Sequence, residues 1–395
     1  METWKKNLYC LWATEFLAAL GISFVLPFLP FYIRELGIKD LHAVELWSGF
    51  IYSGPFIMGT FAGPLWGWLG DRYGRKMMLI RAVIGFGITS ALMAFAQTVE
   101  QLFILRLIQG AVSGFIAATL AIVATTTPRE HMGYAMGVLQ TSLITGSIIG
   151  PFFGGILADH IGYRHIFLIT GGFAFFAALV VLFLVTESPI SSERKDSPGF
   201  LSNFHFVFRT PILVMILLAG FMVQLANMAI SPILALFVES LQPGAEHIAT
   251  VAGGVFAITG LAGLISAPYW GMRGHHLGYK RTLVMNLLGA AVTFIPQAFV
   301  TRIYQLLILR FVHGLFIGGI HPALYTLTSL NVPEERRGGV MGITRSGLLL
   351  GNVAGPITGG LVASSLGMRP LFIFTATILL ILVWVARRSI QEPPH

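Results

Sequence analysis

The residue best suited to chemistry in this chain is Glu15. It lies roughly two helical turns into an apolar segment over residues 7–33, and we interpret it as the only acid clearly inside such a segment. A charged side chain at the centre of a membrane costs about 2.5–3.5 kcal/mol on the insertion scale, so an ionisable residue there indicates function. Because burial favours the neutral form of a carboxyl group, we expect Glu15 to carry a proton. The alternative is a side chain near the cytoplasmic mouth that reaches water.

Three arginines inside apolar segments are the other strongly charged candidates. Arg106 and Arg310 each follow an Ile-Leu pair near the start of a segment. A buried guanidinium stays charged and must pair with a carboxylate or with backbone carbonyls, although each arginine could instead anchor its helix at the outer interface. Arg345 stands seven residues before Asn352, where the two would either hold an anionic substrate or join two helices.

Polar and aromatic side chains on other segments are candidates to line a cavity or to join helices by hydrogen bonds. His313, His321 and Tyr325 fall on roughly one side of their segment, and Gln224 and Asn227 are three residues apart. The two histidines are eight residues apart with no acid near, which is a poor spacing for a metal site, so no metal is expected. The predicted substrate cavity comprises Glu15, Phe16, Ser23, Tyr52, Gln109, Gln140, Gln224, Asn227, His313, His321, Tyr325 and Arg345.

Signatures of ATP-driven or enzymatic chemistry are not found in the sequence. It has no glycine-rich loop that ends in Gly-Lys-Ser or Gly-Lys-Thr, and no catalytic set of residues is recognised. We therefore expect a protein that is not an enzyme and needs no cofactor. The single cysteine, Cys10, excludes a disulfide within the chain.

The composition is that of a membrane protein. Of the 395 residues, 55% are hydrophobic and 11% are charged, whereas soluble domains carry about 25% charged residues. A helix of about 20 apolar residues spans a bilayer. We expect twelve such helices, near residues 7–33, 44–70, 77–96, 102–126, 133–158, 163–186, 210–239, 248–271, 282–300, 304–329, 338–364 and 368–387.

The chain contains two copies of one pattern. Residues 128–170 and 333–375 align without a gap and share about 16 identities. Both copies hold a spaced set of glycines around a proline, and such small residues let membrane helices approach closely. In the first copy the set is Gly146, Gly150, Pro151, Gly154 and Gly155. A duplicated membrane bundle is typical of transporters, whose substrate sites form where two repeats face each other.

A polar stretch separates the two copies, and the loop charges indicate the topology. We predict a six-helix bundle over residues 1–188, a cytoplasmic linker over residues 189–209 and a second bundle over residues 210–395. With the N-terminus inside, Lys and Arg in the loops favour the cytoplasmic side by about three to one, which places both termini in the cytoplasm. Because this orientation accounts for the net charge of +8, no nucleic-acid partner is expected.

One loop is specific enough to indicate a family. Residues 67–76 read Gly-Trp-Leu-Gly-Asp-Arg-Tyr-Gly-Arg-Lys, and their glycines permit a tight turn between antiparallel helices. The loop resembles the loop motif of the major facilitator superfamily. The second half holds a decayed copy over residues 271–280, with His275 in the place of Asp71. The matching residues of the first copy are Gly67, Gly70, Asp71, Arg72, Gly74, Arg75 and Lys76.

Two further motifs resemble those of one group in this superfamily, the bacterial drug:proton antiporters. Residues 105–110, Leu-Arg-Leu-Ile-Gln-Gly, resemble the intramembrane arginine motif of proton-coupled members, and residues 146–155 resemble the antiporter motif of twelve-span drug exporters. The Pro-Phe-Leu-Pro sequence of residues 27–30 is also shared with a subgroup of these exporters. The resemblance implies an all-α polytopic membrane protein of twelve transmembrane helices in two six-helix bundles, with a central cavity.

The resemblance also implies a function. It suggests proton-coupled export of amphipathic drugs or related small molecules by alternating access, carried out by a monomer in a bacterial inner membrane. Glu15 would bind proton and cationic substrate in competition, Arg106 would tune that acid, and Asp71 would hold the cytoplasmic ends of the two halves together. Related exporters often carry a second acid where this chain has Ser23. The expected partners are a small-molecule substrate, protons and the lipid bilayer.

Two alternatives to drug export stay open at this stage. The first is carriage of a specific metabolite, such as a siderophore, a sugar or a glycolipid, with import included. The second is a membrane receptor or scaffold built on the same fold.

Overall fold

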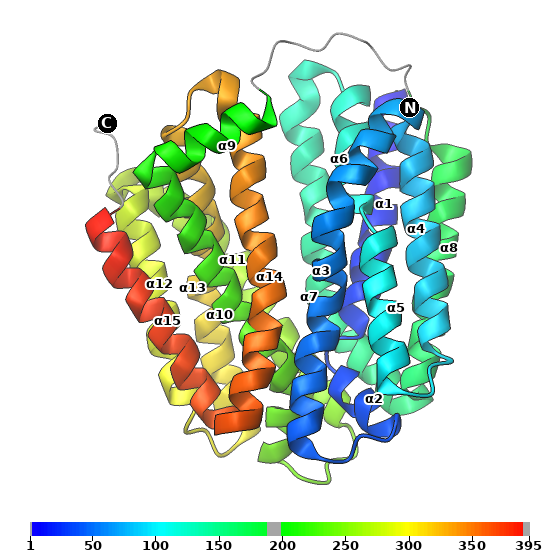
Figure 1. The fold of residues 1–395 in the computed structure, drawn as a ribbon, viewed down its shortest axis with the longest axis vertical. Coiled ribbons are helices and arrows are strands. Elements are labelled where there is room, and N and C mark those ends of the chain that lie inside the picture. The colour runs from blue at the N-terminus through cyan, green and yellow to red at the C-terminus, as the bar shows by residue number, and fades with distance from the viewer. Residues whose placement is uncertain (1, 188–198, 390–395) are drawn as a thin grey trace. The chain divides into compact units, whose positions relative to one another are not determined.

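Helices make up the regular structure of the computed structural model, which describes residues 2–187 and 199–389 (Figure 1). Within these ranges ten helices are long and apolar enough to cross a membrane. Two others, α3 (Leu41–Tyr73) and α12 (Tyr279–Gln297), have 33 and 19 residues but do not meet that apolar criterion. With these two, the helices account for the twelve expected spans, so the predicted all-α membrane fold is confirmed.

One compact unit comprises Met1–Asp40, Phe50–Ser192 and Gly244–Ala257. It includes most of α3 and the start of a helix of the second half. Its remaining elements are α1 (Thr3–Phe24), α2 (Leu29–Glu35), α4 (Arg75–Met93), α5 (Val99–Val112), α6 (Phe115–Thr126), the short 3-10 helix η1 (Arg129–His131), α7 (Met132–Ile161) and α8 (Tyr163–Leu184).

The other unit comprises Leu41–Gly49, Glu193–Pro243 and Ile258–His395. Helices α12, α13 and α15 of this unit lie side by side (Figure 1). Besides α12, its elements are α9 (Phe200–Arg209), α10 (Pro211–Leu241), most of α11 (Ile248–Leu277), α13 (Ile303–Leu330), the 3-10 helix η2 (Glu334–Arg336), α14 (Arg337–Leu366) and α15 (Met368–Ser389).

The structure departs from the expected spans at three places. The span expected over residues 7–33 is broken between α1 and α2. Pro27 lies in the gap and Pro30 in the first turn of α2, and proline cannot donate a helical hydrogen bond. The span over residues 102–126 is broken between α5 and α6 at Gly114, whose φ of +118° lies in the left-handed region that glycine tolerates. The end of the expected linker is a helix, α9.

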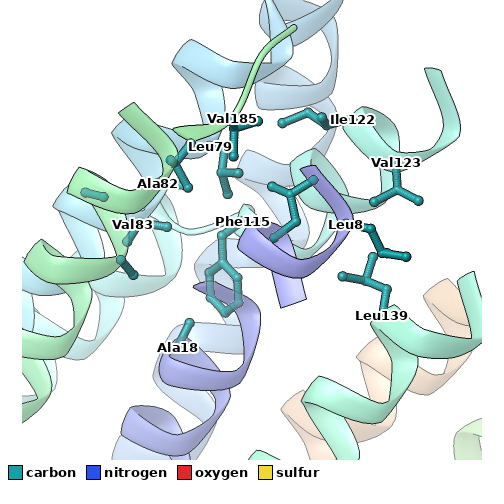
Figure 2. Close-up of a cluster of buried hydrophobic side chains, with 14 of the residues drawn as sticks. Leu8, Ala18, Leu79, Ala82, Val83, Phe115, Ile122, Val123, Leu139 and Val185 are labelled. Carbon is teal, nitrogen blue, oxygen red and sulfur yellow. The ribbon is translucent and has the colours of Figure 1, made fainter. Parts of the chain in front are cut away.

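Apolar side chains from five parts of the first unit meet in one buried cluster (Figure 2). Leu8 comes from α1, Leu79 from α4, Phe115 from α6 and Leu139 from α7, while Val185 follows α8. The cluster joins segments far apart in the sequence, and this packing holds α1 and α7 in the positions that the site requires.

The spaced glycines form the close contacts between helices. On α7, a Cβ atom added to Gly146 would lie 2.7 Å from the Cβ of Ala19, and one added to Gly150 would lie 2.5 Å from the Cβ of Ser23, both on α1. In the second unit, a Cβ added to Gly351 of α14 would lie 2.7 Å from Gln224 of α10. Such spaces are too small for a methyl group, so glycine is what permits these helices to pack.

Candidate functional site

Glu15 is buried in the first unit, where it contacts Ser142. Its side chain on α1 is 1% exposed, and the Ser142 hydroxyl of α7 lies 3.0 Å from Oε2 of the carboxylate. The glycine contacts explain this proximity. Residues four apart share one face of a helix, so Glu15, Ala19 and Ser23 of α1 lie opposite Ser142, Gly146 and Gly150 of α7 in successive pairs.

The Ser142 hydroxyl offers the carboxyl group a partner in either protonation state. The same oxygen lies 2.6 Å from the backbone carbonyl of Leu139. A serine hydroxyl has one hydrogen to donate and lone pairs to accept with. When Glu15 is charged, Ser142 can donate to it. When Glu15 is protonated, Ser142 can donate to Leu139 and accept the carboxyl hydrogen.

Aromatic side chains flank this pair along α1. The rings of Trp12 and Phe16 stack with centroids 5.3 Å apart, and the Trp12 indole nitrogen donates to Thr141 of α7 over 2.9 Å. Thr141 directly precedes Ser142. Flat apolar rings next to a carboxyl group suit an amphipathic cation.

Arg106 lies elsewhere in the first unit. Its guanidinium, on α5, donates to Gln109 over 3.1 Å, and Gln109 donates to Ser90 of α4 over 3.0 Å. It also lines a narrow crevice with Ile22 of α1 and with Val25, which directly follows that helix. Ile22 is about 10 Å along the helix from Glu15. The structure therefore does not bring Arg106 next to Glu15, and the expectation that Arg106 tunes this acid stays a prediction.

Several of the expected cavity residues lie inside helix interfaces instead. Ser23 packs against Gly150, Tyr52 donates to the backbone carbonyl of Leu26, and Gln109 belongs to the Arg106 network. These three side chains and His313 are each less than a tenth exposed. The sequence could not distinguish these interface positions from cavity positions, because both use small and polar residues.

His313 of α13 contacts the neighbouring helix α12. Its Nδ1 lies 2.9 Å from the Thr293 hydroxyl, and its ring lies 4.1 Å from that of Phe294. One turn earlier, Arg310 is buried with its guanidinium over Phe294 and Phe372. This part of α13 therefore serves helix packing.

The remaining cavity candidates are more accessible. Phe16, Gln224, Asn227 and His321 are half-buried, and Gln140, Tyr325 and Arg345 are exposed. Gln224 of α10 donates to Asn352 of α14 over 2.6 Å, and the rings of His321 and Tyr325 stack 6.5 Å apart. Within residues 2–187 and 199–389, Arg345 has no hydrogen bond or ion pair, so the alternative in which it joins two helices has no polar contact to support it.

At the predicted loop motif the chain turns sharply between α3 and α4. Gly74 has a φ of +99°, and α4 begins at Arg75. The Arg75 side chain donates to the carbonyl of Ala121 over 3.0 Å, and Lys76 donates to that of Leu182 over 2.8 Å. Of the remaining motif residues, Gly67, Gly70 and Arg72 lie at the end of α3, and the side chain of Asp71 lies outside the part of the chain that the structure describes.

Three acids that contact helix ends or lie buried were not expected from the sequence. Glu187, which directly follows the span expected over residues 163–186, accepts from the backbone amides of Arg75 and Lys76 over 2.6 and 3.2 Å and so caps α4. Glu45, one turn into α3, is 1% exposed with a carboxylate oxygen 3.8 Å from His42. Asp159, the third, accepts from the start of α11. Each of these acids lies at the beginning or directly after the end of an apolar segment. That position in the sequence could have indicated that they cap or join helices.

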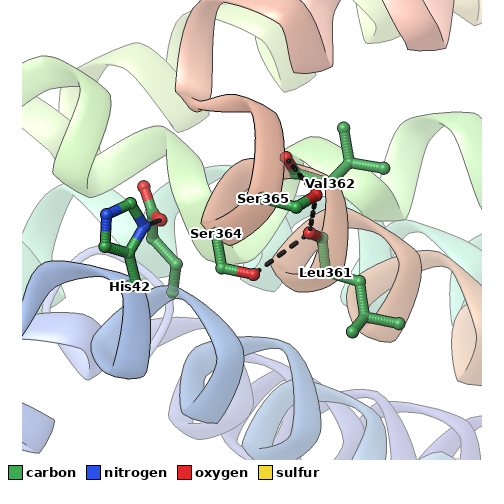
Figure 3. A network of polar contacts seen from close by, with 6 residues as sticks. His42, Leu361, Val362, Ser364 and Ser365 are labelled. Atoms are coloured by element: carbon green, nitrogen blue, oxygen red, sulfur yellow. Dashed lines mark hydrogen bonds and ion pairs between the residues drawn. The ribbon is translucent and has the colours of Figure 1, made fainter.

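The surroundings of His42 show how the start of α3 packs against α14 in the second unit. His42 lies near the end of α14, where Ser364 and Ser365 donate to the carbonyl of Leu361 over 3.0 and 2.7 Å (Figure 3). A Cβ atom added to Gly360 would lie 2.7 Å from the carbonyl oxygen of Glu45. Gly360 of α14 thus packs against the first turns of α3, as Gly155 of α7 packs against the start of α11.

Comparisons with known proteins agree with this architecture. The family model described as Major Facilitator Superfamily matches residues 11–249 and 216–395. The multidrug resistance protein MdtG of Proteus mirabilis (strain HI4320) is 36% identical over 394 residues, covering 99% of this chain and 98% of the relative. MdtG of Escherichia fergusonii is 37% identical over 396 residues, with 99% and 96% covered.

Solved structures share the fold at much lower identity. A bacterial homologue of the human lysosomal transporter Spinster, in an inward-facing and occupied conformation, superposes with a TM-score of 0.84 at 15% identity over 100% of both chains. A D-xylose–proton symporter superposes with a TM-score of 0.80 at 16% identity over 99% of both chains.

Proposed function

The chain belongs to the Major Facilitator Superfamily, and on that premise we propose that it exports amphipathic drugs or related small molecules in exchange for protons, by alternating access. The relatives named as multidrug resistance proteins, 36–37% identical over nearly the whole chain, support this substrate class. We place the protein as a monomer in a bacterial inner membrane, with both termini in the cytoplasm, in line with the loop charges.

The observation that carries the proposal is the contact between Glu15 and Ser142. A proton carrier must be tolerable in the membrane both with and without its proton, because alternating access exposes it to both sides. Buried charges are costly unless they are hydrogen-bonded, and the Ser142 hydroxyl supplies a bond in either state. We assign Glu15 as the group that exchanges a proton for a cationic substrate.

The comparison of the two halves supports a single acidic site. The position of Gly146 against Ala19 corresponds to that of Gly351 against Gln224. One turn before Gln224, α10 has Gly220, which packs against Leu348, where α1 has Glu15. The second half therefore repeats the packing without the carboxyl group.

The experiment is transport in proteoliposomes with an imposed pH gradient. We expect ethidium to be transported against its gradient by the wild-type protein and only while the pH gradient lasts. Glu15→Gln should abolish this transport, whereas Glu335→Gln, which removes an exposed acid in η2, should not. Gradient-driven transport by Glu15→Gln at the wild-type rate would overturn the assignment.

One observation favours a second substrate class. Arg345 is exposed on α14, and an arginine fork binds carboxylate or phosphate oxygens well. A carrier for an anionic metabolite is therefore the second candidate, with Arg345 as its anchoring residue.

A further inference from the structure

The short helix α9 presents its apolar side chains outward. Leu201 is 80% exposed, Phe208 52% and Phe204 44%, and the last two rings lie 4.5 Å apart. Residues three and four apart share a helix face, so these three side chains form one continuous apolar stripe. Polar side chains would occupy such a face if it met water.

The opposite face of α9 is fastened to the second unit by polar contacts. Arg336 of η2 donates to the Ser202 hydroxyl over 3.1 Å and to Asn203 over 3.4 Å, and its guanidinium lies 5.1 Å from the Phe206 ring. Asn203 and Val207 are buried. These contacts orient the helix and leave the apolar stripe on its outer side.

The short connection between α9 and α10 determines where the apolar stripe lies relative to the membrane. A single residue, Thr210, separates α9 from α10, and its hydroxyl donates to the carbonyl of Phe206 over 2.8 Å. Helix α10 is long and apolar enough to span the membrane from Pro211. The C-terminal end of α9 is consequently held at the boundary of the bilayer, and exposed Arg209 and His205 stand beside the stripe.

We propose that α9 is an interfacial helix that lies in the headgroup layer of the cytoplasmic leaflet and binds anionic phospholipid. Leu201, Phe204 and Phe208 enter the upper acyl region, while Arg209 pairs with lipid phosphate. Amphipathic helices with large apolar side chains on one face and cations beside them bind membranes in this way. The assignment of the leaflet follows the proposed topology, but lipid binding itself does not depend on transport.

The test is site-directed spin labelling in liposomes of phosphatidylcholine and phosphatidylglycerol. In a Cys10→Ser background, single cysteines replace Leu201, Phe204 and Phe208. Glu335→Cys provides a water-exposed reference, and Phe176→Cys, on an exposed face of α8, provides a lipid-exposed one. We expect the three α9 labels to be relaxed by oxygen and shielded from a water-soluble nickel chelate, as the Phe176 label is.

Two results would overturn lipid burial. Labels as accessible to nickel as the Glu335 label would show that the stripe meets water. Labels shielded from both oxygen and nickel would show that protein covers it, either another part of this chain or a second copy.

A second arm tests the anionic headgroup. Arg209→Gln, or liposomes of phosphatidylcholine alone, should move the Phe208 label to a shallower depth, seen as a lower ratio of oxygen to nickel relaxation. An unchanged ratio in both would overturn the binding of anionic phospholipid at Arg209. Because neither arm measures transport, the result is independent of the drug-export proposal.

Discussion

Glu15 and Ser142, a carboxyl group and a hydroxyl group in contact, form the site that we propose for proton exchange. Glu15 could be predicted from the sequence, because an acid within an apolar run is costly and rare. Ser142 could not, because it lies 127 residues away along the chain and serines in membrane helices commonly bond to their own backbone. Only the packing of α1 on α7 identifies it as the partner.

Ser142→Ala tests this partnership. The alanine cannot donate to the charged carboxylate, and a hydrogen bond to a charged group contributes about 1.5–3 kcal/mol, so we expect gradient-driven ethidium transport to fall about ten-fold or more. Ser142→Thr keeps the hydroxyl and should retain most of the activity. Equal initial rates for the alanine variant and the wild type would show that the hydroxyl has no part in coupling.

Arg345 tests the substrate charge. If it anchors anionic ligands, Arg345→Ala should abolish competition by carboxylate compounds while ethidium transport persists. If it supports only the drug-export cycle, the variant should lose all transport or none. We expect the second result, because the loop and glycine motifs match drug exporters, and a selective loss of anionic competitors would reverse that expectation.

Helices pack here through rows of glycine, and these rows were visible in the sequence. The spaced pattern predicted close helix contacts, and the structure shows Gly146 and Gly150 against α1 and Gly351 against α10. The breaks after α1 and α5 and the existence of α9 were not predicted. A ten-residue helix is too short to be recognised as a membrane span. Its exposed apolar face can be identified only when the structure shows which face packs against the protein.

Gly146→Ala should destabilise the folded protein. Its Cβ would lie 2.7 Å from that of Ala19, and overpacking a tight interface costs about 1–3 kcal/mol. Gly137→Ala on the same helix is the matched control, since nothing lies within 4 Å of a Cβ there. We expect a lower midpoint of thermal unfolding in detergent for Gly146→Ala only, and equal midpoints for both variants would contradict the packing account.

The start of α11 is held by Asp159, which accepts from the Thr250 amide over 2.8 Å and from its hydroxyl over 2.6 Å. The first amides of a helix have no partner within the helix, so Asp159→Ala should speed hydrogen exchange in residues 248–253 by about ten-fold. Ser364 occupies the equivalent position in the second copy and donates to its own helix, so Ser364→Ala should leave this exchange unchanged. Unaltered exchange in Asp159→Ala would show that the cap contributes nothing.

At the scale of the whole molecule, the sequence repeat predicted two six-helix bundles, and the structure adds how the chain connects them. The first turns of α3 belong to the second unit, and those of α11 belong to the first. These assignments depend on contacts between distant parts of the chain. The hydrophobic periodicity of a single segment cannot predict such contacts. During alternating access, α3 and α11 each join one unit to the other and are therefore the helices in which a hinge is expected.

Substrate and proton are expected to compete for Glu15, and proton release on ligand binding tests this competition most directly. Tetraphenylphosphonium is added to purified protein in weakly buffered detergent solution at a pH at which Glu15 carries its proton, and a pH-indicator dye measures the protons released. We expect the protein to release protons in proportion to the amount of cation that it binds. Glu15→Gln should bind the cation without this release, and Glu335→Gln should behave as the wild type does. Equal proton release by Glu15→Gln and the wild-type protein would contradict the account.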